Sequence, residues 1–407
     1  MRAAAVAFAL LASALAACVD ELPAEMATSS EVIGGASAPA GKWPEVAAVL
    51  FGGQPQCTGV LIAPTIALTA GHCNDPTLGS ILVGTSSLAR TAEGETINVM
   101  QRIEYPDSLQ TEDLTVLVLE RPSRFTPRPI ASGWARFDIQ DGARAVIAGY
   151  GAIDRDARVY INDLQEAETT ITDADCTRKP GCNRSVAPGG ELGAGGMGID
   201  TCPGDSGGPL YVLTDHGTFL AGITSRAYDD AQYECTGGGI YARPDKVLDW
   251  IEASAGVPVA RGPEPTAAPI TALRGHGGET SIAANDPRSK KHAFEIAAQP
   301  SRGAAAVRGD GRVRVCTDPA APPGEDSVTV TVTDRADASR KVDVRIPVLV
   351  EEGDPGADCS ATDFEDGGGC CDSGRSARGS LPLALGVLLV LWRRRERRPV
   401  ARMFGWS

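Results

Sequence analysis

The chain has 407 residues, 11 cysteines and a formal net charge of −14 at pH 7. This length suffices for a two-lobed enzyme core and one small further domain. The acidic charge argues against a nucleic-acid partner, and it is compatible with attraction of basic substrates or with solubility alone. The cysteines, several of them in short-range pairs, indicate an exported protein. Their spacing matches no metal site, so we expect no metal and no cofactor.

The first 17 residues predict an export signal, because Arg2 precedes a short core of alanine and leucine that ends in small residues. The stretch Leu15-Ala16-Ala17-Cys18 is similar to a bacterial lipobox, which implies that diacylglycerol is attached to Cys18 once the signal is removed. Simple signal cleavage that leaves Cys18 free is the alternative. The prediction is an exported protein at the cell surface, at the outer membrane or outside the cell.

Three segments carry residues suited to nucleophilic catalysis. An apolar run over 59–63 predicts a buried strand, and the sequence LTAGHC that follows contains His72. A second strand, of alternating leucine and valine, begins after Asp113. In TCPGDSGGPL, Ser206 lies between Gly204 and Gly207, and these glycines permit a tight turn with N–H groups beside an exposed hydroxyl. Taken alone, the last segment is also compatible with a surface turn, and Asp113 with a strand-edge carboxylate.

The chain order His72, Asp113, Ser206 resembles that of the trypsin-like serine endopeptidases, over roughly residues 32–253. The resemblance implies an all-β domain at 32–256, built of two six-stranded antiparallel barrels of the chymotrypsin type with a C-terminal helix. It implies that Ser206 is the nucleophile, that His72 carries its proton to the leaving amine, and that Asp113 orients the imidazole. The N–H groups of Gly204 and Ser206 would form the oxyanion hole, and the substrates would be polypeptides.

The same resemblance implies three disulfides in this domain. One would hold the histidine loop, one would brace the specificity pocket, and the third would close a loop that is followed by a longer segment than the family usually has. The implied pairs are Cys57–Cys73, Cys202–Cys235 and Cys176–Cys182.

Asp200, six positions before Ser206, matches the residue at the base of the family's primary pocket and implies cleavage after Arg or Lys. The other pocket residues that the resemblance implies are Ser225, Ala227 and Gly239. Arg226 stands where the family usually has an aromatic residue, and it either folds over the pocket to compete for Asp200 or points to solvent. The alternatives are a protease of different preference and a surface-displayed binding or adhesion protein with an inactive protease fold.

Residues 18–31 are predicted to be a propeptide. The segment SSEVIGG at 29–35 resembles the family's activation site, where cleavage before Val32 would free an ammonium group that pairs with the carboxylate of Asp205. Glu31 precedes this bond, and an enzyme with Asp200 in its pocket should not cleave after Glu. We therefore expect another protease to activate the chain.

Further along, apolar residues at helical spacing predict a closing helix within 242–256, and a segment rich in Pro and Ala predicts a semi-extended linker over 257–269. Residues 270–350 predict a small β-sandwich. Its segments 327–334 and 341–350 alternate with period two, and 293–315 adds two strands around a Gly-Asp-Gly turn. The unit resembles the cadherin-like or immunoglobulin-like modules of bacterial surface proteins, which serve as spacers or in adhesion. His216 is expected to be a solvated loop residue.

Residues 351–380 form a predicted linker rich in Gly and Cys, and 381–407 hold an apolar run followed by an arginine cluster. The run is shorter than the ~20 residues that a membrane-spanning helix needs. The order of cysteines, apolar run and arginines resembles the myxobacterial C-terminal sorting tail, with a plain tail anchor as the alternative. We therefore expect the membrane as a partner, through a lipid on Cys18, the C-terminal segment, or both.

Overall fold

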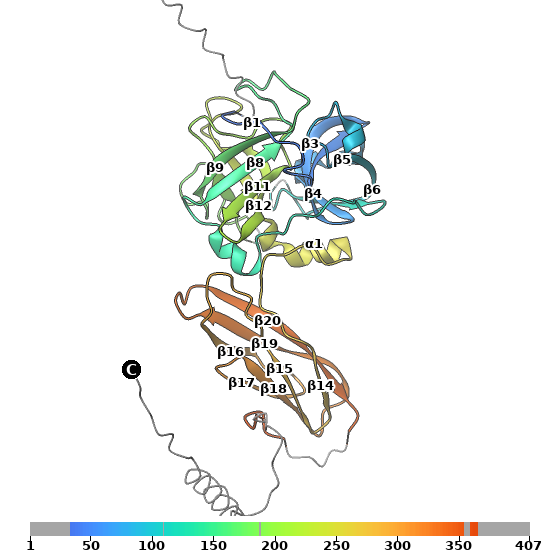
Figure 1. Ribbon diagram of the computed structural model, residues 1–407, viewed down its shortest axis with the longest axis vertical. Coiled ribbons are helices and arrows are strands. Elements are labelled where there is room, and N and C mark those ends of the chain that lie inside the picture. Colours follow the sequence, from blue (N-terminus) through green and yellow to red (C-terminus); the bar gives the residue numbers. More distant parts are fainter. Residues whose placement is uncertain (1–32, 109, 187–188, 354–358, 365–407) are drawn as a thin grey trace, which may run out of the picture.

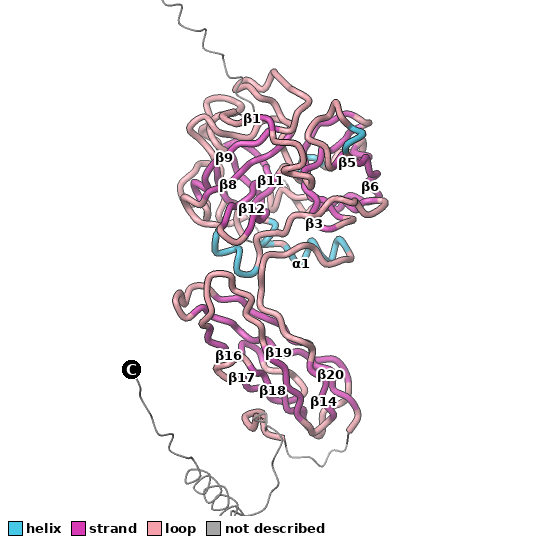
Figure 2. Tube along the Cα trace, viewed as in Figure 1, coloured by secondary structure: helices cyan, strands magenta, loops and turns pink. Residues whose placement is uncertain are grey.

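The structure, a computed structural model, describes residues 33–108, 110–186, 189–353 and 359–364. The predictions for Cys18, Val32 and 381–407 lie outside these residues. Figure 1 shows a two-lobed domain with an elongated β-sandwich beyond it, and Figure 2 shows how strands dominate both parts. The predicted fold class, two barrels followed by a sandwich, is confirmed.

The first lobe is a closed barrel of six antiparallel strands in the order β2-β3-β4-β7-β6-β5. The strands are β2 (Val46–Phe51), β3 (Gln54–Ala63), β4 (Ile66–Thr69), β5 (Leu78–Val83), β6 (Glu95–Glu104) and β7 (Thr115–Leu119). Aliphatic side chains fill the barrel, among them Leu61, Ile81 and Leu117. The predicted apolar run over 59–63 is the buried half of β3.

The second lobe is also a ring of six strands, because the sheet β9-β10-β13-β12-β11-β8 closes through pairing of β8 with β9. The strands are β8 (Arg144–Gly149), β9 (Gln165–Asp173), β10 (Leu192–Ala194), β11 (Pro209–Thr214), β12 (Gly217–Ala227) and β13 (Gly239–Ala242). A short strand β1 (Ala36–Ser37) adds to the edge of β9. The closure removes the exposed edges that an open sheet of this size would present.

The closing helix is shorter than predicted. A 3-10 turn η4 (Pro244–Lys246) comes first, and α1 runs over Leu248–Ala255. Pro244 lacks the N–H that a helix interior requires, so the regular helix begins only after it. Gly256 ends the helix at φ 67° and donates its N–H to the carbonyl of Glu252.

The sandwich packs a four-stranded sheet, β14-β20-β19-β16, on a three-stranded sheet, β15-β18-β17. The strands are β14 (Ile270–Leu273), β15 (Gly277–Ser281), β16 (His292–Ala298), β17 (Gly303–Val307), β18 (Arg312–Thr317), β19 (Gly324–Asp334) and β20 (Lys341–Glu351). Strand β20 alternates between buried and exposed residues along its whole length, as predicted. The prediction of two strands in 293–315 was wrong, because β16, β17 and β18 all have residues there. The connection through Pro300 divides the first part of this segment into β16 of one sheet and β17 of the other.

A fourth disulfide, which sequence analysis did not find, joins Cys316 of β18 to Cys359. It fastens the segment that follows β20 to the sandwich. Phe364, the last residue described, lies within cation–π range of Arg308 and Arg312 on the same sheet. Residues 359–364 are therefore held against the sandwich at both of their ends.

The Pro- and Ala-rich segment 257–269 is extended, but it is packed along the two-lobed domain. Ala260 donates its N–H to the carbonyl of Ile62 in the first barrel and accepts from Ile130 between the barrels, at 2.8 and 2.9 Å. Gly262 donates back to Ile130, and a Cβ there would lie 2.6 Å from the carbonyl oxygen of Ser132. The segment therefore holds the sandwich against the protease-like domain.

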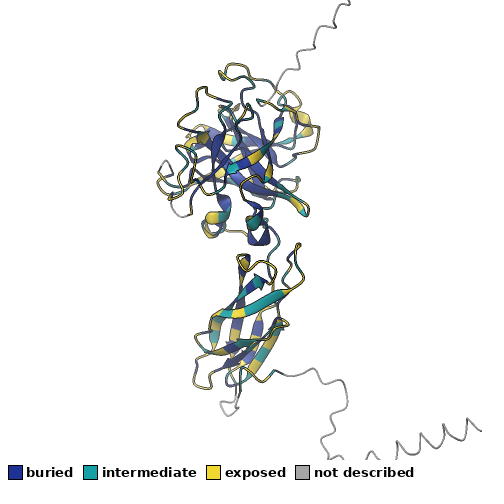
Figure 3. Ribbon diagram, turned by 90° about the vertical axis from the view of Figure 1, so that its left-hand side faces the viewer, coloured by how far each residue is buried: buried dark blue, intermediate teal, exposed yellow. Residues whose placement is uncertain are grey.

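The two domains share part of one hydrophobic core. Trp134, in the turn η3 (Gly133–Asp138) between the barrels, is only 1% exposed and packs among the valines of β19 and β20. Its indole N–H donates to the carbonyl of Ala284 at 2.6 Å. Asp138 contacts Arg288 of the sandwich and lies 3.2 Å from His216, which is therefore a half-buried interface residue and not a solvated one. Figure 3 shows the buried interiors of both domains.

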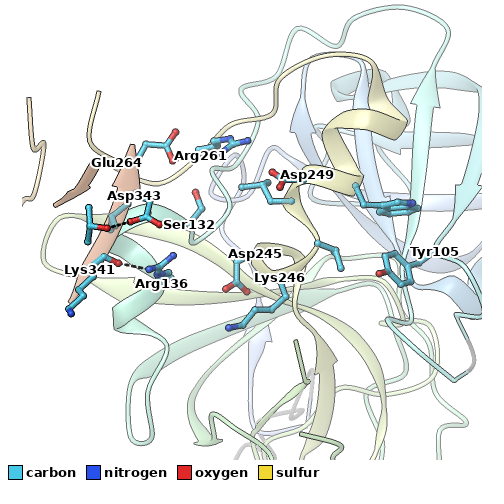
Figure 4. A pocket seen from close by; sticks show the side chains of 16 residues that line it. Tyr105, Ser132, Arg136, Asp245, Lys246, Asp249, Arg261, Glu264, Lys341 and Asp343 are labelled. Atoms are coloured by element: carbon cyan, nitrogen blue, oxygen red, sulfur yellow. Dashed lines mark hydrogen bonds and ion pairs between the residues drawn. The ribbon is translucent and has the colours of Figure 1, made fainter. Parts of the chain in front are cut away.

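Beside this interface, a cavity of about 760 Å³ separates α1 and η4 from strands β19 and β20. Figure 4 shows Arg136 donating to the carbonyl of Lys341 on one side of the lining. Charges of both signs line the cavity, and some are already paired, as Arg261 is with Glu252 at 2.5 Å. The lining therefore matches no single class of ligand.

Candidate active site

His72 and Asp113 face each other at the end of the first barrel. His72 lies in the 3-10 turn η1 (Gly71–Cys73) directly after β4, and Asp113 lies just before β7, which pairs with β4. The backbone N–H of His72 donates to Oδ1 of Asp113 at 2.8 Å, and Nδ1 of the imidazole lies 2.8 Å from Oδ2. The hydroxyl of Ser225 donates to the same Oδ2 at 2.6 Å.

These contacts set the charge states of the pair. Burial alone would raise the pKa of Asp113, but the hydrogen bond and charge of His72 and the hydrogen bond from Ser225 outweigh it and hold this pKa below its usual value. The hydrogen bond to Asp113 raises the pKa of His72, against burial and the charge of Arg226. Asp113 therefore stays ionised, and the Nδ1 proton of His72 is held toward it, which leaves Nε2 to accept a proton.

Ser206 comes from the second barrel, in the turn before β11. It is half-buried, its carbonyl accepts from the N–H of Thr58 at 2.9 Å, and Sγ of Cys73 lies 3.7 Å from that carbonyl oxygen. Gly207 has φ +83°, and a Cβ there would lie 2.1 Å from Oγ1 of Thr69. Only glycine lets this turn pack against the strand that leads to His72, so the structure brings the serine turn and the histidine turn together.

Gly204 and Ser206 carry the backbone N–H groups expected to bind an oxyanion. Gly204 has φ +99°, and a Cβ there would lie 2.8 Å from Cα of Gly151. Within the described residues neither N–H donates to another protein group, whereas the intervening Asp205 donates to the carbonyl of Cys202. The two N–H groups are therefore available to a ligand beside the serine.

The structure pairs the six cysteines of this domain as the resemblance implied. One disulfide fixes the turn of His72 to β3, and another links the segment before the serine turn to the loop before β13. The pairs are Cys57–Cys73, Cys202–Cys235 and Cys176–Cys182.

Asp200 lies beside β13, close to the pair that Gly239 forms with Ala227 of β12. It is 1% exposed and accepts from the N–H groups of Thr201 and Gly238 at 2.8 and 2.9 Å. Burial nonetheless raises its pKa to about 6. Ala227 and Gly239 pair across the two strands, and a Cβ on Gly239 would lie 3.5 Å from Oδ1 of Asp200. These three residues therefore come together, whereas the hydroxyl of Ser225 is committed to Asp113.

A trypsin family model matches residues 32–251, more than half of the chain and the whole of the site described above. The chain belongs to the trypsin family. It is 29% identical to human serine protease 56 over 249 residues, which is 57% of this chain and 40% of that protein. It is 32% identical to rat transmembrane protease serine 9, covering 54% of this chain and 22% of that protein.

The chain thus spans two fifths or less of the length of these curated relatives. Among solved structures it is similar to mouse neuropsin, described as a serine protease of the limbic system, at 28% identity and a TM-score of 0.45. That match covers 54% of this chain and 98% of neuropsin.

Arg226 does not fold over Asp200, and its side chain is 43% exposed although it is paired. Its guanidinium forms a bidentate pair with the carboxylate of Glu191, at 2.6 and 2.9 Å, and also donates to the carbonyl of Gly181. It therefore does not occupy Asp200. Glu191 is the residue of this trypsin family site that sequence reasoning missed, because nothing in the sequence links it to Arg226, 35 positions later.

Asp205 is a buried carboxylate without a cation beside it in the described part of the chain. It is 1% exposed and accepts from the N–H groups of Gly151 and Cys202, at 2.7 and 2.9 Å. Burial raises its pKa to about 7. Val32 lies outside the described residues, but Ile33, which follows it, packs against the nearby disulfide Cys202–Cys235.

Glu112, next to Asp113, is a second acidic group that sequence analysis did not single out. It is fully buried, and burial raises its pKa to about 8 although Oε2 accepts from the N–H of Arg243. Glu112 is therefore largely protonated at neutral pH and leaves Asp113 as the charged carboxylate beside His72.

Proposed function

We propose that the chain is an exported serine endopeptidase that cleaves peptide bonds after Arg or Lys through an acyl-enzyme. The observation that carries the proposal is the hydrogen-bonded pair His72–Asp113 beside the glycine-flanked turn of Ser206. Oγ of Ser206 attacks the scissile carbonyl carbon while Nε2 of His72 takes the hydroxyl proton. The imidazolium then protonates the leaving amine, and water hydrolyses the ester by the same route with His72 as base.

The preference for Arg or Lys is supported by Asp200. A carboxylate whose burial raises its pKa to about 6 lacks a compensating charge, and a cationic substrate head would supply one. Glu191 holds Arg226 away from this carboxylate. Binding of a cationic side chain should therefore strengthen as pH rises through about 6 and Asp200 ionises.

Activation by cleavage before Val32 is supported by Asp205. An unpaired carboxylate this deeply buried is unfavourable, and a new ammonium terminus would neutralise it. Because Glu31 does not fit a pocket with Asp200, the activating enzyme should be a different protease. Maturation of the purified precursor at Val32 by itself would contradict this part of the proposal.

Export is consistent with the fold, since disulfide-bonded trypsin-like domains are typical of secreted proteins. Within the described residues, no helix is long and apolar enough to cross a membrane. We propose attachment of the precursor to the membrane through a lipid on Cys18, through 381–407, or through both. Cleavage before Val32 would then separate the catalytic domain from its lipid, so mass spectrometry of the active form should find no acyl chain.

The test is a chain that begins at Val32 and ends after Phe364, assayed beside its Ser206→Ala variant on esters of Arg, Lys, Phe, Ala and Glu. We expect Arg and Lys esters to be cleaved, with a loss of about a million-fold in the variant. Cleavage after Phe or Ala would retain the triad and reject the role of Asp200. A folded protein that cleaves none of the esters would favour a binding or adhesion protein.

A further inference from the structure

Arg226 is fixed at the edge of the site beside the triad. A cavity of about 280 Å³ next to His72 and Asp113 is lined by its side chain and by Glu191, Ser225 and other residues, nearly all of them polar. The side chain of Arg226 is 43% exposed and that of Glu191 is 2% exposed, so the carboxylate lies behind the guanidinium. With two bonds to Glu191 and one to the carbonyl of Gly181, the guanidinium has a single well-defined position.

A fourth hydrogen bond leads from Arg226 to the triad. Nη1, which donates to Glu191, also donates to Oγ of Ser225 at 3.2 Å. A serine hydroxyl has one proton and two acceptor sites, whereas a guanidinium can only donate. Ser225 therefore has to accept from Arg226, which directs its one proton to Oδ2 of Asp113, 2.6 Å away.

The result is a continuous hydrogen-bonded series: Glu191, Arg226, Ser225, Asp113, His72. It begins at the buried carboxylate of Glu191, which also accepts a hydrogen bond from the N–H of Asn183 at 2.9 Å. It ends at the imidazole that must accept the proton of the nucleophile. Ser225 is 5% exposed, so water cannot readily replace Arg226 as its donor.

We propose that Arg226, anchored by Glu191, is a positioning residue that acts through the hydroxyl of Ser225 to hold Asp113 in place for catalysis. The inference rests on the proposed protease function and deepens it. Arg226 is assigned no contact with substrate in this role. Its loss should lower turnover, even for a substrate too small to contact Arg226.

The test is a double-mutant cycle on a blocked single-residue arginine ester. Replacing Arg226 alone would leave Glu191 buried and unpaired, so the pair variant is Glu191→Gln with Arg226→Met. It is measured beside Ser225→Ala and beside the triple variant, which combines all three substitutions. Arg184→Met is the control for loss of an exposed cation near the same cavity. Melting temperatures establish that each variant is folded, and Arg226→Lys serves as a milder replacement if the pair variant is not.

We expect the pair variant to lose about tenfold in kcat with little change in KM, as for one charge-assisted hydrogen bond. Ser225→Ala should add little to the pair variant, since the two changes break the same connection. The Arg226→Lys variant should have a kcat between those of the pair variant and the wild type, and the kcat of Arg184→Met should equal that of the wild type.

Fully additive losses in an active enzyme would overturn the inference, as would a change confined to KM or to longer peptides. The latter result would make Arg226 a substrate contact. Absence of any Ser206-dependent hydrolysis by the unsubstituted chain would instead overturn the proposed function itself, so the two failures are distinguishable.

Discussion

Trp134 provides the sharpest test of how the two domains are joined. The residue belongs by sequence to the protease domain, but its indole is 1% exposed and lies in the core of the sandwich. Replacing a buried tryptophan by alanine typically lowers the free energy of unfolding by about 3–5 kcal/mol. If the sandwich were only tethered by a flexible linker, Trp134 would face solvent, and the same change would stay within about 0.5 kcal/mol.

The assay is calorimetry and urea unfolding of the chain carrying Ser206→Ala, which prevents self-digestion. We expect Trp134→Ala to lower the stability of the sandwich and to separate its unfolding from that of the barrels. Trp134→Phe keeps most of the ring volume but loses the hydrogen bond to Ala284, so a smaller loss of about 1–2 kcal/mol is expected. Met100→Ala, at a side chain that is 68% exposed, is the control. An effect of Trp134→Ala no larger than this control would refute the docking.

Three further predictions follow from single features. Burial raises the pKa of Asp205 from 3.8 to about 7, so the folded state binds the proton of this carboxyl more tightly than the unfolded state does. The free energy of unfolding therefore falls by about 4 kcal/mol as pH rises through this range. Urea unfolding of the uncleaved chain at pH 4 and 8 should show this loss, and Asp205→Asn should remove it. Gly239→Val should place a bulky side chain against Asp200, because a Cβ at this position already lies 3.5 Å from Oδ1 of Asp200. The change should lower kcat/KM for Arg and Lys esters on the order of 100-fold, while an Ala ester is still cleaved. Joint replacement of Cys316 and Cys359 by serine opens a loop of 43 residues and should destabilise the sandwich by up to about 4 kcal/mol in thermal unfolding.

The features that were predictable from sequence are those encoded locally. His72 and Ser206 sit in short glycine-containing turns whose backbone requirements can be recognised in a few residues, as the φ of Gly207 shows. The alternation of buried and exposed residues along β20 can be recognised within a single strand, because one face of the strand packs on the core and the other faces water. In each case the residues that create the signal are within ten positions of one another, whereas the two barrels were expected only from the family resemblance that these motifs carry.

The features that were not predictable depend on contacts between distant segments. Glu191 could not be assigned to Arg226 because the pairing arises from the approach of β10 to β12 across β13. Cys359 could not be paired with Cys316 because each is isolated from the short-range cysteine pairs. Trp134 looks like one more apolar residue of the protease domain until the sandwich is placed against it.

The composition of 257–269 led to the expectation of a semi-extended linker, and the structure shows why composition could not reveal how this linker is packed. Proline and alanine limit regular secondary structure, but they do not prevent an extended chain from donating and accepting single hydrogen bonds, as Ala260 does between Ile62 and Ile130. Because Ile62 belongs to the first barrel and Ile130 to the connection between barrels, this segment joins the first barrel to that connection. The sandwich is fixed to that same connection through Trp134. Removing residues after 256 would therefore expose Trp134 and release hydrogen bonds of the first barrel and of the connection between the barrels, so the trypsin-family domain and the sandwich are best treated as one structural unit.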